Sequence, residues 1–74
     1  MLKTFELIVE GQVQRVGFRN FVSQIALELN IKGTVENLAE EKVQITAQGE
    51  QDKILEFIKR IWTTEWPIDV WNIE

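Results

Sequence analysis

Residues 11–19 read Gly-Gln-Val-Gln-Arg-Val-Gly-Phe-Arg, and the rest of the chain is organised around this stretch. The pattern predicts an apolar strand before it and an amphipathic helix after it, so the stretch forms the loop between them. A loop that leads into a helix can gather backbone N–H groups around an anion. Arg19 adds a planar guanidinium, whose donors match the oxygens of a phosphate or carboxylate. The stretch is therefore a candidate anion site.

The apolar pattern on both sides of the loop predicts a strand, a helix, two strands, a second helix and a last strand. These elements cover residues 2–10, 18–30, 33–37, 42–48, 51–62 and 68–73. Gly11 is expected to end the first strand, Asn30 the first helix and Gly49 the third strand. Trp62 fits the apolar stripe of the second helix and is expected to pack, whereas Trp66, beside Pro67, is expected to be exposed.

The predicted order is β-α-β-β-α-β, with one apolar stripe on each helix. Two such helices fit over one face of a four-stranded antiparallel sheet, which is the ferredoxin-like sandwich of the α+β class. The chain, residues 1–74, forms a single domain in this interpretation. The first and third strands are central, and the strand that ends at Asn37 lies at an edge of the sheet.

Composition excludes several kinds of chemistry. The 74 residues contain no cysteine and no histidine, so thiolate metal sites, cysteine nucleophiles and histidine bases are absent, and no metal or cofactor is expected. The net charge of −4 argues against a nucleic-acid partner. The strand predicted at residues 42–48 also lacks the aromatic side chains on which RNA bases would stack. Phosphate chemistry without a titrating base remains compatible with this inventory.

No apolar run approaches the length of a membrane span, and no charged-then-apolar leader precedes a cleavage site. We expect a cytoplasmic protein with no membrane partner. The expected oligomeric state is a monomer, with a dimer through an exposed edge strand as the alternative.

Two blocks of this sequence resemble the acylphosphatase family. Residues 11–19 are similar to its signature, Gly-x-Val-Gln-Gly-Val-x-Phe-Arg. Residues 33–37, Gly-Thr-Val-Glu-Asn, resemble its second block, Gly-aromatic-Val-x-Asn. The spacing of the two blocks and the predicted order of elements both agree with that family, so the resemblance spans nearly the whole chain.

The resemblance implies an enzyme that hydrolyses acyl phosphates to a carboxylate and inorganic phosphate, with inorganic phosphate or sulfate as product or inhibitor and with no cofactor. It assigns catalysis to Arg19, which holds phosphate, and to Asn37, which orients water. The residues that it assigns to phosphate binding are Gln12, Val13, Gln14, Arg15, Val16, Gly17 and Phe18, through their backbone amides, and Arg19, through its guanidinium. The side chain of Phe18 is expected to lie in the core. The side chain of Gln14 has two interpretations, one in which it lines the site and one in which it caps the turn.

Three positions depart from the family pattern. Arg15 stands where the signature has glycine, Thr34 replaces the aromatic residue of the second block, and Glu41 replaces a turn glycine. Arg15 is either a second cation beside the anion or an obstruction. Members of the family usually continue to a short fifth strand, which these 74 residues do not include. The changes at Arg15 and Glu41 and the lack of that strand favour an alternative function, a non-catalytic module of the same fold that binds phosphate or another anion.

Overall fold

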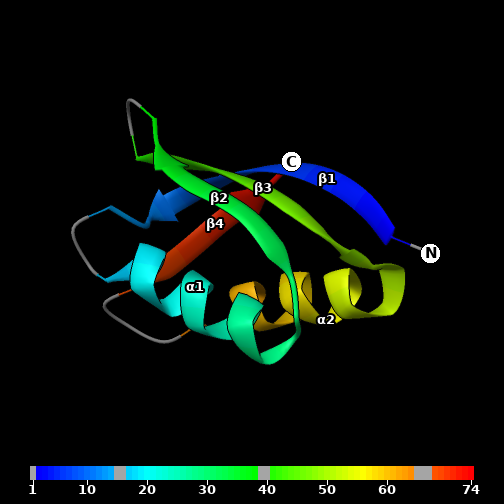
Figure 1. The fold of residues 1–74 in the computed structure, drawn as a ribbon. Helices are drawn as coiled ribbons and strands as arrows, with labels where there is room; N and C mark the ends of the chain where they lie inside the picture. The colour runs from blue at the N-terminus through cyan, green and yellow to red at the C-terminus, as the bar shows by residue number, and fades with distance from the viewer. Residues whose placement is uncertain (1, 15–16, 39–40, 65–67) are drawn as a thin grey trace.

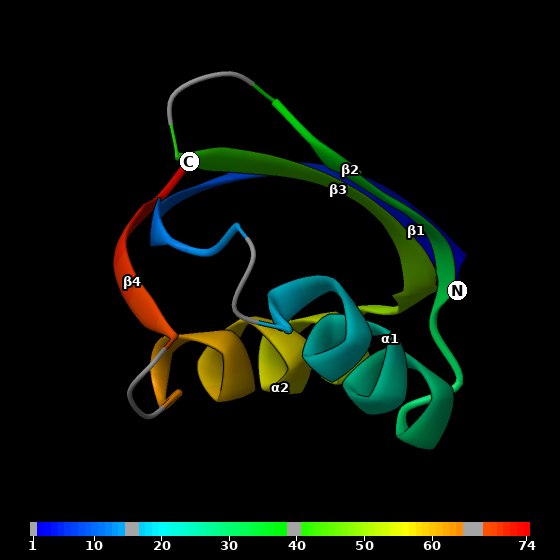
Figure 2. The same cartoon turned by 90° about the vertical axis from the view of Figure 1, so that its left-hand side faces the viewer.

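The computed structural model describes residues 2–14, 17–38, 41–64 and 68–74. Its elements are β1 (Leu2–Gln12), α1 (Phe18–Glu28), β2 (Lys32–Asn37), β3 (Lys42–Glu50), α2 (Gln51–Trp62) and β4 (Asp69–Ile73). The four strands form one antiparallel sheet in the order β2-β3-β1-β4 (Figure 1). Both helices lie side by side on one face of that sheet (Figure 2). The prediction of a ferredoxin-like sandwich with central β1 and β3 is confirmed.

The core lies between the sheet and the helices because alternate strand residues point to the same face. Val43, Ile45 and Ala47 of β3 are buried, as their spacing of two predicts. The stripe of α1 is buried through Phe18, Val22 and Ile25. Ile54, Phe57 and Ile61 fill the same layer from α2. One apolar face from each element therefore meets the others, and the opposite face of the sheet lies away from both helices.

Four predictions about the core and the element ends are wrong. Trp62 is 47% exposed, so it lies outside the stripe of α2 that was expected to bury it. Two glycines do not end their strands, because β1 continues through Gly11 to Gln12 and β3 continues through Gly49 to Glu50. The helix α1 ends at Glu28, before the predicted Asn30. Trp66 lies outside the described residues.

The end of α1 has a clear local cause. Asn30 adopts the left-handed conformation, with φ of 57°. Its N–H donates to the carbonyl of Leu27, and the N–H of Ile31 donates to the carbonyl of Ala26 at 2.8 Å. This pair of bonds is the Schellman motif, in which asparagine is tolerated where glycine is most common. Asn30 therefore stops the helix from just beyond its last turn, whereas the prediction placed Asn30 inside the helix as its last residue.

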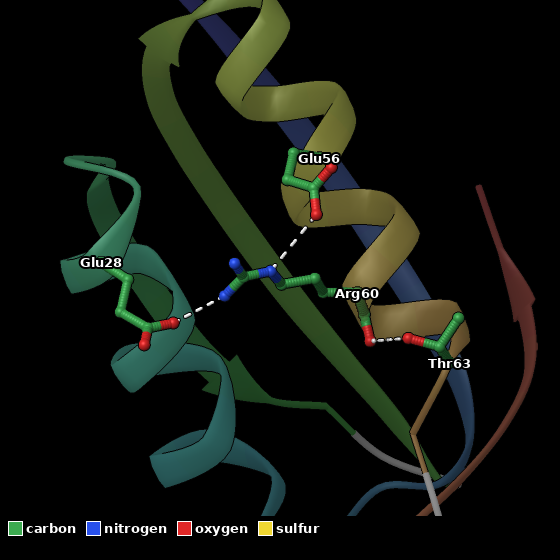
Figure 3. A network of polar contacts seen from close by, with 4 residues as sticks. All are labelled: Glu28, Glu56, Arg60 and Thr63. Carbon is green, nitrogen blue, oxygen red and sulfur yellow. Dashed lines mark hydrogen bonds and ion pairs between the residues drawn. The ribbon is translucent and has the colours of Figure 1, made fainter.

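A single arginine joins the two helices on the solvent side (Figure 3). Arg60 of α2 donates to the Glu28 carboxylate of α1 at 2.6 Å and to Glu56 one turn earlier at 3.3 Å. The hydrogen bond to Glu28 raises the pKa of the guanidinium above its ordinary value, and the bond to Glu56 adds to it. Arg60 therefore stays charged at every working pH.

Neither helix in the described part of the chain is long and apolar enough to cross a membrane.

Candidate anion site at the start of helix α1

The loop between β1 and α1 is anchored at both ends by core residues. Val13 follows β1 and is 1% exposed, and Phe18 opens α1 and is 1% exposed. The ring of Phe18 also packs against Phe21, with 6.5 Å between the ring centroids. Both anchors were predicted to bind phosphate through their backbone amides, and the side chains of both lie in the core, as was predicted for Phe18. Only their backbone N–H groups are left for an anion, and that role stays a prediction.

The N-terminus of α1 carries no group of the described chain that would compete with an anion. Gly17 is the N-cap residue, in the left-handed conformation with φ of 79°, and no side chain caps the helix. The first turn contains no acidic residue. The first intrahelical bond runs from the N–H of Phe21 to the carbonyl of Gly17, at 3.0 Å. The N–H groups of Phe18, Arg19 and Asn20 therefore have no partner within the helix, and they point out of its N-terminal end.

Arg19 lies in this first turn and is exposed. Its carbonyl accepts a hydrogen bond from Ser23 Oγ at 2.8 Å, which fixes the backbone of the turn. Among the described residues no side chain pairs with its guanidinium, whereas Arg60 is held by two carboxylates. In the described part of the chain, the guanidinium that the sequence assigns to the anion site is therefore held by no carboxylate. Arg15 and Val16 lie outside the described residues.

Gln14 connects this loop to the turn between β2 and β3. Its Nε2 donates to the carbonyl of Leu38, and to the carbonyl of Lys42 at 3.0 Å. Those two residues also bond to each other, because the N–H of Leu38 donates to the carbonyl of Lys42 at 2.9 Å. The side chain of Gln14 is therefore used to hold a neighbouring segment. Neither interpretation from the sequence, lining the site or capping its own turn, anticipated this connection.

A second contact joins the same two segments. The N–H of Gly11 donates to the carbonyl of Glu41 at 3.0 Å. Glu41 has a φ of 62°, so it adopts the left-handed conformation that the glycine of the family pattern would favour. The end of β1 and the β2–β3 turn are thereby fixed to each other through Gly11 as well as Gln14. In Figure 1 both segments lie at the same end of the sheet.

Asn37 is the last residue of β2 and pairs with Val43 in the register of β3. It is exposed, and it directly precedes Leu38, which Gln14 holds. The structure thus fixes the predicted water-orienting residue, through one intervening peptide, to the loop that carries the predicted phosphate donors. The sequence contained both blocks but no signal for the hydrogen bonds that join them.

The glycine that opens the loop is required by a close approach of two strands. A Cβ atom at Gly11 would lie 2.1 Å from the carbonyl oxygen of Asp69 in β4. Here Glu10 pairs with Asn72 and Gly11 pairs with Val70, so Trp71 is an extra residue on β4. This β-bulge bends the edge strand beside the loop, as bulges often do next to functional sites. Gly11 therefore shapes the start of the loop without ending β1.

Two surface grooves of the described chain lie elsewhere. One is lined by residues of α1, α2 and the segment before β4, and the other lies between α1 and β2. Neither of these two grooves is lined by Asn37 or by a described residue between positions 12 and 19. The candidate site is therefore described by backbone donors and two polar side chains at the end of the sheet, apart from both grooves.

Comparisons with known proteins identify the family. An acylphosphatase of Methanospirillum hungatei is 42% identical over 73 residues, which are 97% of this chain and 80% of that relative. An acylphosphatase of Archaeoglobus fulgidus is 49% identical over 57 residues, which are 73% of this chain and 64% of that relative. The chain thus covers less than two thirds of the length of some relatives.

Solved structures show the same relationship. The crystal structure of acylphosphatase from Bacillus subtilis matches with a TM-score of 0.92 at 32% identity, covering 100% of this chain and 81% of that chain. Full-length HypF, in a phosphate- and nucleotide-bound form, matches with a TM-score of 0.92 at 32% identity, over 100% of this chain and 10% of that chain. The acylphosphatase family model matches residues 5–74, and the chain belongs to the acylphosphatase family.

Proposed function

We propose that this chain hydrolyses acyl phosphates to a carboxylate and inorganic phosphate, with Arg19 and the start of α1 holding the phosphate and Asn37 orienting the attacking water. Family membership and the shared fold support hydrolysis of acyl phosphates as the activity. The observation that supports the assignment of residues is the connection made by Gln14, which links the loop between β1 and α1 to the segment that follows Asn37.

The chemistry needs little beyond positioning and charge. Water attacks phosphorus in line with the acyl oxygen, the bond between phosphorus and that oxygen breaks, and the carboxylate leaves with the electron pair. A carboxylate is a good leaving group, so no strong general acid is required. The proton of the water passes to a phosphate oxygen or to solvent. Charge on the phosphoryl oxygens is stabilised by the Arg19 guanidinium and by the N–H groups of the loop and first helical turn.

Asn37 suits the water-orienting role because an amide both donates and accepts hydrogen bonds without titrating. One amide can therefore hold the water at every pH at which the chain is folded. The rate should then show no pH dependence that originates from Asn37. The backbone amides of residues 12–18 complete the proposed phosphate site, and Arg15 is proposed as a second cation beside it. A cytoplasmic location stays a prediction from the sequence.

The test is hydrolysis of benzoyl phosphate by the wild type, Arg19→Ala and Asn37→Ala. Loss of a preorganised transition-state donor typically costs about 100- to 1,000-fold in kcat, and we expect that range for both variants. Arg19→Ala should also raise KM, because a guanidinium binds the ground-state phosphate. Matched controls are Lys53→Ala on α2 and Asn72→Ala on β4, both exposed and neither in the proposed site.

A wild type no faster than the uncatalysed reaction would refute the hydrolase assignment, and full activity in both site variants would refute the roles of the two residues. The alternative, a non-catalytic anion-binding module, is favoured by one observation, that the same fold covers 10% of the larger HypF chain. It predicts binding of inorganic phosphate or sulfate without turnover. Titration calorimetry with phosphate beside the assay separates the two functions.

A further inference from the structure

One of the two grooves runs along α1 beside the end of α2. Its volume is about 780 Å³, within the range of about 300–1,000 Å³ that small-molecule pockets occupy. Phe21 and Ile25 line it from α1, and Ile68 lines it from the segment that directly precedes β4. Ile25 belongs to the core, and Phe21 and Ile68 pack against that core, so this apolar wall is held in place. The groove therefore offers a preformed surface to an apolar ligand.

The near end of this groove adjoins the proposed phosphate site. Phe21 lies in the first turn of α1, where its N–H donates to the carbonyl of Gly17 at 3.0 Å. An α-helix rises about 6 Å over four residues, so the groove begins about 6 Å along α1 from its N-cap. On the opposite wall, Ile68 directly precedes Asp69, which pairs with Gln12 at the end of β1. A ligand in the groove is thus about one helical turn away from the N–H groups proposed to hold phosphate.

The proposed reaction directs the acyl group toward this groove. In Figures 1 and 2 the end of β2 lies above the segment from β1 to α1, whereas the end of α2 lies below that segment. Asn37 is the last residue of β2, so the water that it is proposed to orient approaches phosphorus from above. In-line attack places the acyl oxygen on the other side of phosphorus. The acyl group of a phosphate held at the start of α1 therefore points toward the end of α2 and the groove.

An ion pair marks the far end of the groove (Figure 3). Glu28 and Arg60 both line the groove, and the guanidinium of Arg60 reaches from α2 to the Glu28 carboxylate of α1 at 2.6 Å. Phe21 and Glu28 are separated along α1 by about 10 Å of helical rise, which is room for an acyl chain of about six to eight carbons. A longer chain would meet the charged pair. The groove is therefore apolar near the phosphate site and charged at its other end.

We propose that the groove between α1 and α2 holds the acyl group, so that this chain prefers acyl phosphates with an apolar acyl chain of medium length over acetyl phosphate. The inference rests on the proposed function, because the direction of the acyl group follows from the roles of Arg19 and Asn37. Full burial of one methylene improves binding about fourfold, and a surface groove covers about half of the chain, so we expect about twofold for each methylene.

The first measurement is kcat/KM for acetyl, butanoyl, hexanoyl, octanoyl and dodecanoyl phosphate. We expect a rise of about 10- to 20-fold from acetyl to hexanoyl phosphate and no further rise beyond octanoyl phosphate. A second measurement is independent of hydrolysis. It is the Kd of the corresponding alkylphosphonates by titration calorimetry, because their bond between phosphorus and carbon is not hydrolysed. The affinity should rise with chain length in the same way.

Three variants test where the chain lies. Arg60→Met removes the ion pair at the far end and should extend the rise in kcat/KM to dodecanoyl phosphate. The matched control is Lys59→Met, which makes the same change in charge at an exposed neighbouring position that does not line the groove, and it should keep the wild-type profile. Ile68→Asn places an amide in the apolar wall and should reduce the ratio of hexanoyl to acetyl phosphate about fivefold or more. Its melting temperature is measured alongside, and Arg60→Met decides the question if Ile68→Asn does not fold.

The two measurements separate this proposal from the proposed function. An active wild type whose kcat/KM and alkylphosphonate affinity do not change with chain length overturns the groove and leaves the hydrolysis intact. An inactive wild type whose alkylphosphonate affinity still rises refutes the hydrolysis and supports the groove as the binding site of the chain. Absence of alkylphosphonate binding overturns the proposal. A rise that is the same in the wild type, Ile68→Asn and Arg60→Met also overturns it, because the chain then binds elsewhere.

Discussion

Replacing Gln14 by methionine tests the connection between the two halves of the proposed site. Methionine keeps the length of the side chain and removes both donors, so the carbonyls of Leu38 and Lys42 lose their partner. A net hydrogen bond contributes about 0.5–1.5 kcal/mol, so two bonds are worth about 1–3 kcal/mol. All three residues are half-buried, so water can partly replace the lost donor, and we expect the lower half of that range.

Urea unfolding followed by circular dichroism measures this change as a shift of midpoint at constant slope. A loss of about 1.5 kcal/mol corresponds to a fall in Tm of about 6–12 °C for a chain of this size. The proposed mechanism adds a second expectation, because the turn after Asn37 then keeps only the bond from the N–H of Gly11 to the carbonyl of Glu41 among its described bonds to this end of β1 and the loop. Misplacement by about 1 Å can cost about 100-fold in rate, so kcat should fall about 10- to 100-fold.

Gln24→Met is the matched control, because Gln24 is an exposed glutamine of α1 outside the proposed site. It should change neither the unfolding free energy nor kcat. The reasoning fails if Gln14→Met unfolds at the same urea concentration as the wild type. If Gln14→Met is destabilised as expected but keeps full kcat, then Gln14 stabilises the fold without positioning Asn37.

Two glycine positions and one strained glutamate give further predictions. Glu41→Gly should stabilise the fold by about 1 kcal/mol in urea unfolding, because Glu41 has a φ of 62° and only glycine adopts this conformation without strain; an unchanged or lower midpoint would contradict this. Gly33→Ala should fail to fold or lose more than about 3 kcal/mol of unfolding free energy, because its Cβ atom would lie 1.7 Å from the carbonyl oxygen of Thr46. A native circular dichroism spectrum and melting temperature would contradict this. Gly17→Ala should lose only about 1–2 kcal/mol, because its Cβ would meet no atom within 4 Å and only the φ of 79° is unfavourable; a loss as large as that of Gly33→Ala would contradict this.

The fold could be predicted because its main signals are periodic. The spacing of two in β3 and of three and four in α1 and α2 identified the buried faces, and Asn30 gave the end of a helix. Glycine was less informative. Gly11 and Gly49 suggested strand ends, yet both lie within strands. At Gly11 the missing side chain serves a close approach to β4, which depends on a strand almost sixty residues later and leaves no local pattern.

The sequence suggests candidate residues for the site, and their roles stay predictions, whereas the hydrogen bonds between their segments could not be predicted. The two motif blocks contained Arg19 and Asn37, and the structure leaves both exposed and without side-chain partners among the described residues. The role of the Gln14 side chain depends on two carbonyls that are distant in sequence, and carbonyls carry no residue identity. Val13 and Phe18, whose backbone amides are predicted to bind phosphate, contribute their side chains to the core, and for Phe18 this was predicted.

Those carbonyl acceptors have a consequence for how the turn between β2 and β3 tolerates change. Every amino acid offers the same main-chain oxygen, so Gln14 places no demand on which side chains stand at positions 38 and 42. It does require that the two oxygens stay at a fixed distance from the loop. Substitutions at these positions should therefore be accepted widely, whereas an inserted or deleted residue between them would move the acceptors away. Positions 38 and 42 are therefore constrained in spacing and free in side chain, whereas Glu41, with its φ of 62°, is not, which makes these two positions suitable places to vary the charge beside Asn37.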